Sequence, residues 1–110
     1  MSEINMSQEY SDRFDQIRKK MVEMSYYKYG PARQNYSSGN IQAISSCLNA
    51  IDKYKDTGNT EYLADAANYL MFEFMWPQVD GARYKPTSEK ESAGIIGISV
   101  KEMEEYRADL

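Results

Sequence analysis

The chain has 110 residues, with 17 acidic and 13 basic side chains, a formal net charge of −4 and no histidine. This length predicts a single domain with room for three or four short helices, and it excludes an enzyme with a separate cofactor domain. The scattered basic residues form no patch typical of direct nucleic-acid binding, and the lack of histidine excludes the usual hydrolase triads and zinc sites.

The first predicted element is an amphipathic helix that begins at Ser7 and ends near Tyr29. Its apolar residues recur at alternating spacings of four and three: Tyr10, Phe14, Ile17, Met21 and Met24. Gly30 followed by Pro31 supplies a stop. Residues 1–6 carry no periodic signal, and we expect them to be flexible.

The next segment, from Ser25 to Asn40, combines four tyrosines and two basic residues with a Ser/Gly/Asn run, which predicts a linker or a binding loop. Interleaved aromatic and basic side chains can stack on a base and hold a phosphate. Tyrosines beside a helix end also pack at the rim of a bundle, so this alternative stays open. The candidate ligand- or partner-binding residues of the segment are Tyr26, Tyr27, Lys28, Arg33 and Tyr36.

Asn40 is the predicted N-cap of a second helix that closes before Thr57 and Gly58. The apolar positions of this helix again step by three and four: Ile41, Ile44, Cys47, Leu48, Ile51 and Tyr54. Gly58 is expected to be the C′ residue. Because two or three residues then connect it to the next helix, we expect the two helices to form an antiparallel hairpin.

The stretch from Asn59 to Trp76 is the longest apolar-rich run, and it predicts the central helix of the fold. It contains neither glycine nor proline and stops one residue before Pro77. Projected at 100° steps, one broad apolar face is formed by Leu63, Ala67, Leu70 and Phe74. Other apolar residues spread around almost the whole helix surface, which is typical of a central helix.

A narrow polar stripe interrupts this apolar surface. Glu61, Asp65 and Asn68 fall within roughly 60° of one another, because spacings of four and three return to the same face. Such residues can favour the helix dipole and bond to basic or tyrosine groups of a neighbouring helix. The alternative is a metal or ligand site.

After Pro77 the periodicity ends, and we expect an ordered wrap whose middle, residues 86–93, is flexible. Arg83, Tyr84 and Lys85 are further candidates for ligand or partner contacts.

The end of the chain predicts a short fourth helix, because Ser99 to Glu102 form a capping-box pattern before Met103 and Tyr106. The isoleucines at 95, 96 and 98 need burial, on this protomer or on another.

Together these elements predict one all-α domain over residues 1–110, a small three-helix bundle with a C-terminal extension and a short fourth helix. A core of this size is limited, so we expect a homo-oligomer. Ten tyrosines and seven methionines favour adaptable contact surfaces, which indicates partner binding or self-association.

The single cysteine, Cys47, cannot close a disulfide within the chain, and its place on an apolar face predicts a small buried side chain. No apolar run approaches about 18 residues, and no secretion signal follows Met1. We therefore expect a cytoplasmic protein without a membrane span.

The central part of the chain resembles uncharacterised helical proteins of bacteriophages and prophages. Two motifs occur in the same order, Tyr-Lys-Tyr-Gly at residues 27–30 and Thr-Gly-Asn-Thr-Glu-Tyr-Leu at residues 57–63, within roughly residues 20–85. The resemblance implies a phage accessory protein in the host cytoplasm. In that setting it implies non-enzymatic counter-defence, by binding a host defence protein or by sequestering a signalling nucleotide, without a cofactor.

A second similarity is to the MazG-like all-α nucleoside triphosphate pyrophosphohydrolases, through Glu61, Leu63, Ala64 and Asp65. It implies an alternative function in which Glu61 and Asp65 ligate Mg²⁺. In that family the two acids are three residues apart, whereas Tyr62 makes the spacing four here, and the upstream Glu-Glu-x-x-Glu helix is missing. Mg²⁺ chemistry needs several convergent carboxylates. A structural or assembly protein is the third alternative.

Overall fold

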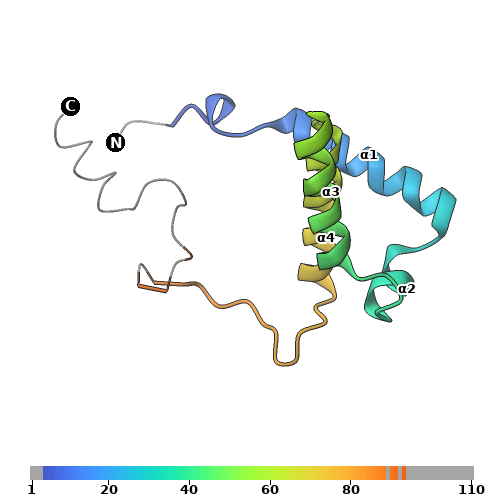
Figure 1. Cartoon of the computed structure of the whole chain (residues 1–110). Helices are drawn as coiled ribbons and strands as arrows, with labels where there is room; N and C mark the ends of the chain where they lie inside the picture. Colours follow the sequence, from blue (N-terminus) through green and yellow to red (C-terminus); the bar gives the residue numbers. More distant parts are fainter. Residues whose placement is uncertain (1–3, 89, 92, 94–110) are drawn as a thin grey trace.

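The computed structural model describes residues 4–88, 90, 91 and 93, and it is helical, as predicted. Two antiparallel helices, α3 and α4, stand side by side, and α1 crosses on the other side of α4 (Figure 1). The elements are a short 3-10 turn, η1 (Met6–Gln8), and the helices α1 (Asp12–Tyr29), α2 (Ala32–Ser37), α3 (Ala43–Thr57) and α4 (Glu61–Met75). No helix in this described part of the chain is long and apolar enough to cross a membrane.

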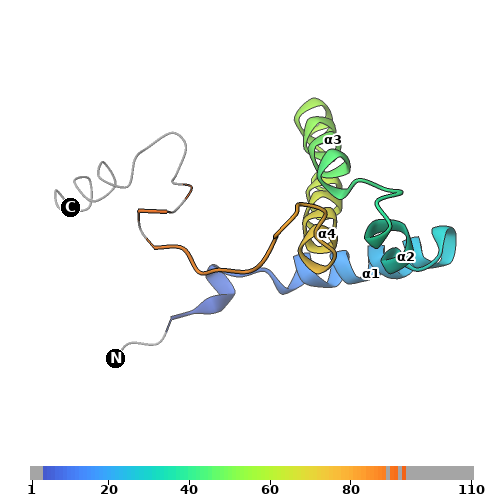
Figure 2. The same cartoon turned by 90° about the horizontal axis from the view of Figure 1, so that it is seen from below.

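The helix α4 is central, as its apolar surface predicts. Seen from below, α4 lies between α3 and α1 (Figure 2). It contacts all three other helices, α1, α2 and α3. The short fourth helix that the sequence predicts from Ser99 onward, and the isoleucines at 95, 96 and 98, lie outside the described residues.

The helix α1 begins at Asp12, so the predicted start at Ser7 is wrong. Ser11 has extended backbone angles and caps the helix, because its Oγ accepts a hydrogen bond from the Phe14 amide at 3.0 Å. Tyr10 matches the helical spacing but lies before the helix, where its hydroxyl donates to Asp15 Oδ2 at 2.6 Å. The predicted end at Tyr29 is confirmed.

The prediction of a linker or loop over residues 25–40 is wrong at Ala32–Ser37, which form α2. Pro31 sits at the N-cap with φ −61, a value that suits a helix start. The ring of Tyr36 packs against that of Phe72 in α4, with ring centroids 4.5 Å apart. This contact stabilises a helix too short to form alone.

The helix α3 begins at Ala43, so the predicted N-cap at Asn40 is also wrong. Gln42 occupies the N-cap without a side-chain hydrogen bond. The antiparallel hairpin of α3 and α4 is confirmed, and so is the role of Gly58, which ends α3 in the left-handed conformation. Asn59 Oδ1 then accepts a hydrogen bond from the Glu61 amide at 3.0 Å in the turn before α4, whose N-cap is Thr60.

Replacing Gly58 with alanine is expected to lower the free energy of unfolding by about 1 kcal/mol, measured by urea denaturation. The added Cβ would meet no atom within 4 Å, so the loss comes from the positive φ of 71° alone. Lys53→Ala, at an exposed position of α3, is the control and should change stability little. Equal stability of the two variants would contradict the left-handed turn.

The core is small, and its central cluster, Cys47, Ala50 and Ala66, joins α3 to α4. No residue of α1 is fully buried. The burial of Cys47 confirms the prediction from sequence, since 4% of it is exposed. The apolar core consists of Ala43, Cys47 and Ala50 from α3 and Ala64, Ala66 and Phe72 from α4.

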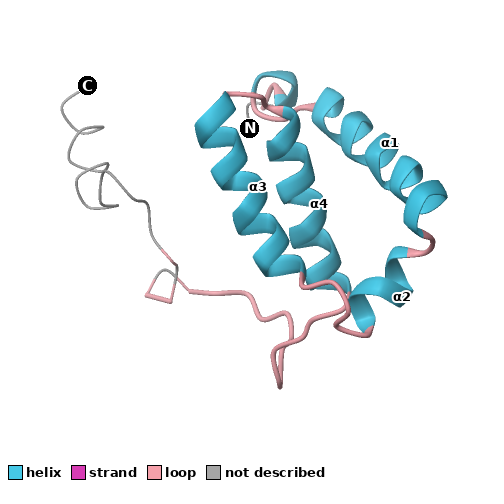
Figure 3. Ribbon diagram, turned by 45° about the vertical axis from the view of Figure 1, so that its right-hand side comes forward, coloured by secondary structure: helices cyan, strands magenta, loops and turns pink. Residues whose placement is uncertain are grey.

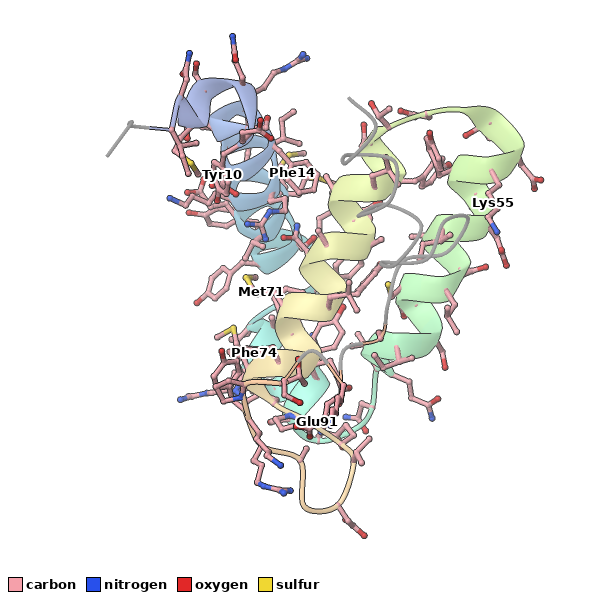
Figure 4. All side chains as sticks on the ribbon, turned by 90° about the vertical axis from the view of Figure 1, so that its left-hand side faces the viewer. Tyr10, Phe14, Lys55, Met71, Phe74 and Glu91 are labelled. Carbon is pink, nitrogen blue, oxygen red and sulfur yellow. The ribbon has the colours of Figure 1, made fainter. Side chains whose placement is uncertain are left out.

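The broad apolar face of α4 is not in this core. Leu70 is 52% exposed and Phe74 is 72% exposed, and on α3 Ile44 and Leu48 are exposed as well. Projected at 100° per residue, the exposed pair on each helix lies on the same side of the line along which α3 and α4 touch. We call these four residues, Ile44, Leu48, Leu70 and Phe74, the hairpin face. Figure 4 looks onto the hairpin with α2 behind α4, and Phe74 lies near the lower end of α4.

Candidate functional site

A pocket of about 300 Å³ lies between α1, α2 and α4. The helices α1 and α4 approach each other at their starts and diverge toward α2, which lies across the wide end (Figure 3). The volume is at the lower end of the range of about 300–1,000 Å³ for sites that bind small molecules.

Aromatic rings form much of the wall. The Tyr36 ring lies 4.5 Å from that of Phe72 and 6.4 Å from that of Tyr69, measured between centroids. Burial raises the pKa of Tyr36 to about 12, with smaller contributions from Tyr69 and Asp65. This phenol therefore stays neutral at physiological pH. The larger apolar and aromatic side chains of the lining are Met21, Val22, Tyr26, Tyr29, Tyr36, Ile41, Tyr69 and Phe72.

Asn68 is a buried polar residue in the pocket lining, with 6% of it exposed. Its Nδ2 donates a hydrogen bond to the backbone carbonyl of Arg18 at 3.1 Å, which joins α4 to α1. Its buried Oδ1 has no hydrogen-bond partner among the described residues. Most buried polar atoms are satisfied, so this unpartnered oxygen is an exception in the wall of the pocket.

Asp65 lines the same pocket and is half-buried. Within the described part of the chain, its carboxylate makes neither a hydrogen bond nor an ion pair. Burial raises the pKa of Asp65, and the negative charge of Glu61 raises it further. The fold therefore holds a carboxylate where its charged form is disfavoured.

The predicted binding residues divide between the pocket and the exposed surface. Tyr26 and Tyr36 line the pocket. Tyr27 is 86% exposed, and Lys28 and Arg33 are exposed as well, outside the lining. The tyrosines therefore contribute to the cavity, whereas the basic residues that would hold a phosphate do not.

The residues predicted after α4 also lie outside the pocket. Tyr84 is 78% exposed, and Arg83 and Lys85 are exposed. The Lys85 ammonium lies 3.6 Å from the Glu91 carboxylate. None of these three residues belongs to the pocket lining.

The two acids of the magnesium alternative lie one turn apart on α4 but differ in exposure. Asp65 lines the pocket, whereas Glu61 is exposed at the start of α4. Over residues 4–88, 90, 91 and 93, no group of three or more His, Cys, Asp or Glu side chains could hold a metal ion. The magnesium site stays a prediction without a third ligand in this part of the molecule.

Sequence reasoning missed the aromatic partners of Asp65 and Asn68. Tyr69 and Phe72 line the pocket with them, and these four residues recur at spacings of three, one and three along α4. Residues at these spacings lie on one face of a helix, so the sequence alone could have grouped Tyr69 and Phe72 with Asp65 and Asn68. The missing information was the position of α2, which makes that face the wall of a pocket.

Comparison with protein-family models, with curated proteins and with solved structures found no significant match. The geometry of the pocket and of the hairpin face therefore carries the functional inference.

Replacing Asp65 with asparagine is expected to raise the free energy of unfolding at neutral pH by less than about 1 kcal/mol. The gain is small because the Asp65 carboxylate keeps some contact with solvent, which screens its charge. The raised pKa means that the folded chain holds the proton more tightly than the unfolded chain. The contribution of the carboxyl to stability is therefore present at low pH and is lost as the pH rises through the raised pKa. The gain of the variant should shrink as the pH falls through the raised pKa and should be absent below 3.8, the ordinary pKa.

Thermal denaturation at several pH values measures this difference. Asp52→Asn is the control, because Asp52 is exposed on α3. If Asp65→Asn instead lowers the free energy of unfolding at neutral pH, the Asp65 carboxylate has a stabilising partner, and the conclusion that it is unpaired is wrong.

Proposed function

We propose that this chain is a non-enzymatic binding protein that encloses a small organic molecule in the pocket between α1, α2 and α4. The observation that carries the proposal is an aromatic-lined cavity in which Asp65 and the Asn68 Oδ1 lack partners. Buried polar groups without partners destabilise a fold, and a ligand that satisfies them restores the lost interactions. Pockets that bind small molecules combine apolar walls with a few such polar groups.

A binding role without turnover follows from the reactive groups in the lining. Among the described lining residues, the ionisable groups are Asp65 and tyrosines, and burial raises the pKa of Tyr36 and Tyr69. Nucleophilic catalysis requires a nucleophile hydrogen-bonded to a base. The described lining contains no such pair.

The resemblance of residues 20–85 to bacteriophage and prophage proteins supports a counter-defence setting for this binding. There, the ligand would be a molecule on which a host defence depends, or the target would be a host defence protein. A signalling nucleotide would meet no Lys or Arg in the described lining, so its phosphates would have to stay outside the pocket. Both targets stay predictions, to be tested by plating phage on defended cells that express the chain.

Protein-observed NMR with a library of small fragments tests the binding function. Saturable shifts are expected at the amides of Ser25, Tyr36 and Asn68, which line the pocket. Ser25→Phe, which fills the cavity from α1, should abolish them. Lys28→Phe adds the same ring to the same helix outside the lining and should leave binding unchanged. Binding that survives Ser25→Phe, or no binding at all, would refute the proposal.

Native mass spectrometry of protein purified from cells identifies the natural ligand. The expected spectrum contains an added small mass that is lost on denaturation and is absent from Ser25→Phe.

We also propose that the binding unit is a homodimer joined through the hairpin face. Within the described residues, no large side chain is fully buried, whereas four large apolar side chains of this face are exposed. None of the four is charged, so a second copy of the face can cover them without burying a charge. Two hairpins packed in this way form a four-helix bundle, which supplies the apolar burial that one chain lacks.

A further inference from the structure

We propose that the pocket binds a small organic cation, a protonated or quaternary amine, with the Asp65 carboxylate as its counter-charge. This inference rests on the proposed binding function and names the chemical class of the ligand. It is carried by the charge of the lining, by the aromatic walls and by the hydrogen-bonding direction of Asn68.

The lining is negative. Asp65 is its single charged side chain among the described residues, and the nearby charge of Glu61 adds to the negative potential. The guanidinium of Arg18, whose carbonyl accepts from Asn68, is itself held by Asp15 at 2.9 Å. No cation of the described chain therefore neutralises Asp65, and a positive ligand can do so.

The walls are suited to a cation. The faces of aromatic rings carry negative electrostatic potential, and a cation within about 6 Å of a ring centroid is attracted to it. Tyr26 and Tyr29 come from α1, Tyr36 from α2, and Tyr69 and Phe72 from α4, so rings approach the cavity from three helices. Several rings around one acid form the aromatic cage that recognises alkylated ammonium groups.

The Asn68 side chain offers an acceptor rather than a donor. Its Nδ2 is occupied by the Arg18 carbonyl at 3.1 Å, which fixes the amide orientation and leaves Oδ1 as the unpartnered atom. The polar groups of the lining that lack partners, Oδ1 and the Asp65 carboxylate, both present oxygens, which favour positive charge or N–H donors.

Other ligand classes fit less well. A phosphate or carboxylate in the pocket would face Asp65 without a basic residue of the described lining to bind it. A neutral hydrocarbon would leave Asp65 and the Asn68 Oδ1 buried without partners. The volume of about 300 Å³ suits an amine head group rather than a long chain.

The test compares choline with its neutral isostere, the alcohol in which carbon replaces the nitrogen, by NMR titration of the full chain. The wild-type protein should bind choline more tightly by about tenfold. Asp65→Asn should remove most of this preference while the alcohol binds as before. Asp52→Asn, which removes the same charge from the exposed surface of α3, should keep it.

A second variant tests the aromatic walls. Tyr69→Leu keeps an apolar side chain but removes the ring, and it should weaken choline binding more than binding of the alcohol. Circular dichroism of each variant verifies the helical fold.

Equal affinity of the wild-type protein for choline and the alcohol would overturn the inference, as would an unchanged preference in Asp65→Asn. If choline, tetramethylammonium and butylammonium all fail to bind, while other fragments bind in a manner that Ser25→Phe abolishes, the cation is wrong and the binding function stands. If no fragment binds, both proposals fail.

Discussion

Replacing Phe72 with alanine is expected to lower the free energy of unfolding by about 3 kcal/mol. Phe72 is the largest side chain of the core, with 7% of it exposed. Its ring contacts Tyr36 at 4.5 Å and stacks on Trp76 at 5.9 Å, measured between centroids. Truncation removes one of the aromatic contacts that hold α2 on α4, so part of the loss should come from unfolding of α2.

Phe74→Ala is the matched control, because it removes the same side chain two residues later on α4. Phe74 is 72% exposed, so the folding of one chain should lose little. Chemical denaturation with circular dichroism and Trp76 fluorescence measures both variants. Equal losses for Phe72→Ala and Phe74→Ala at protein concentrations low enough to keep the chain monomeric would contradict the placement of the two faces of α4.

The second large effect concerns the hairpin face. Replacing Leu48 and Leu70 together with aspartate is expected to convert a dimer into a monomer of 12.7 kDa. Two charges per chain would be buried without partners in the dimer, which costs several kcal/mol. Sedimentation or light scattering after gel filtration measures the mass. The wild-type unfolding midpoint should also rise with protein concentration, and that of the variant should not.

The control for added charge is Gln34→Asp with Asn49→Asp, at exposed positions outside the hairpin face. This pair should stay dimeric. A wild-type chain that is monomeric at all concentrations would refute the homodimer.

The period of the apolar residues predicts the helices and their order, although only α3 and α4 bury residues of these patterns and Phe14, Ile17 and Met24 of α1 stay exposed. The hairpin also follows from sequence, since Gly58 ends one helix and only two residues separate it from Glu61, where the next helix begins. Cys47 lies on the stripe that faces α4, and its burial follows from the same pattern.

The apolar period could not predict the features that depend on contacts between helices. The α2 helix has no apolar period of its own, and it depends on Tyr36 packing against Phe72. On α4, apolar residues surround the helix, so the pattern could not distinguish the buried Phe72 from the exposed Phe74. The polar stripe pointed to Asp65 and Asn68, but the aromatic rings opposite them come from α1 and α2.

The buried thiol of Cys47 makes the hairpin a reporter of its own motions. Burial raises the pKa of Cys47, so the reactive thiolate is scarce and shielded while α3 lies on α4. A thiol-labelling reagent can then react only after the two helices separate, and each chain carries one cysteine. Labelling kinetics under native conditions would therefore report how often this pair opens, at a single known position and without any added probe.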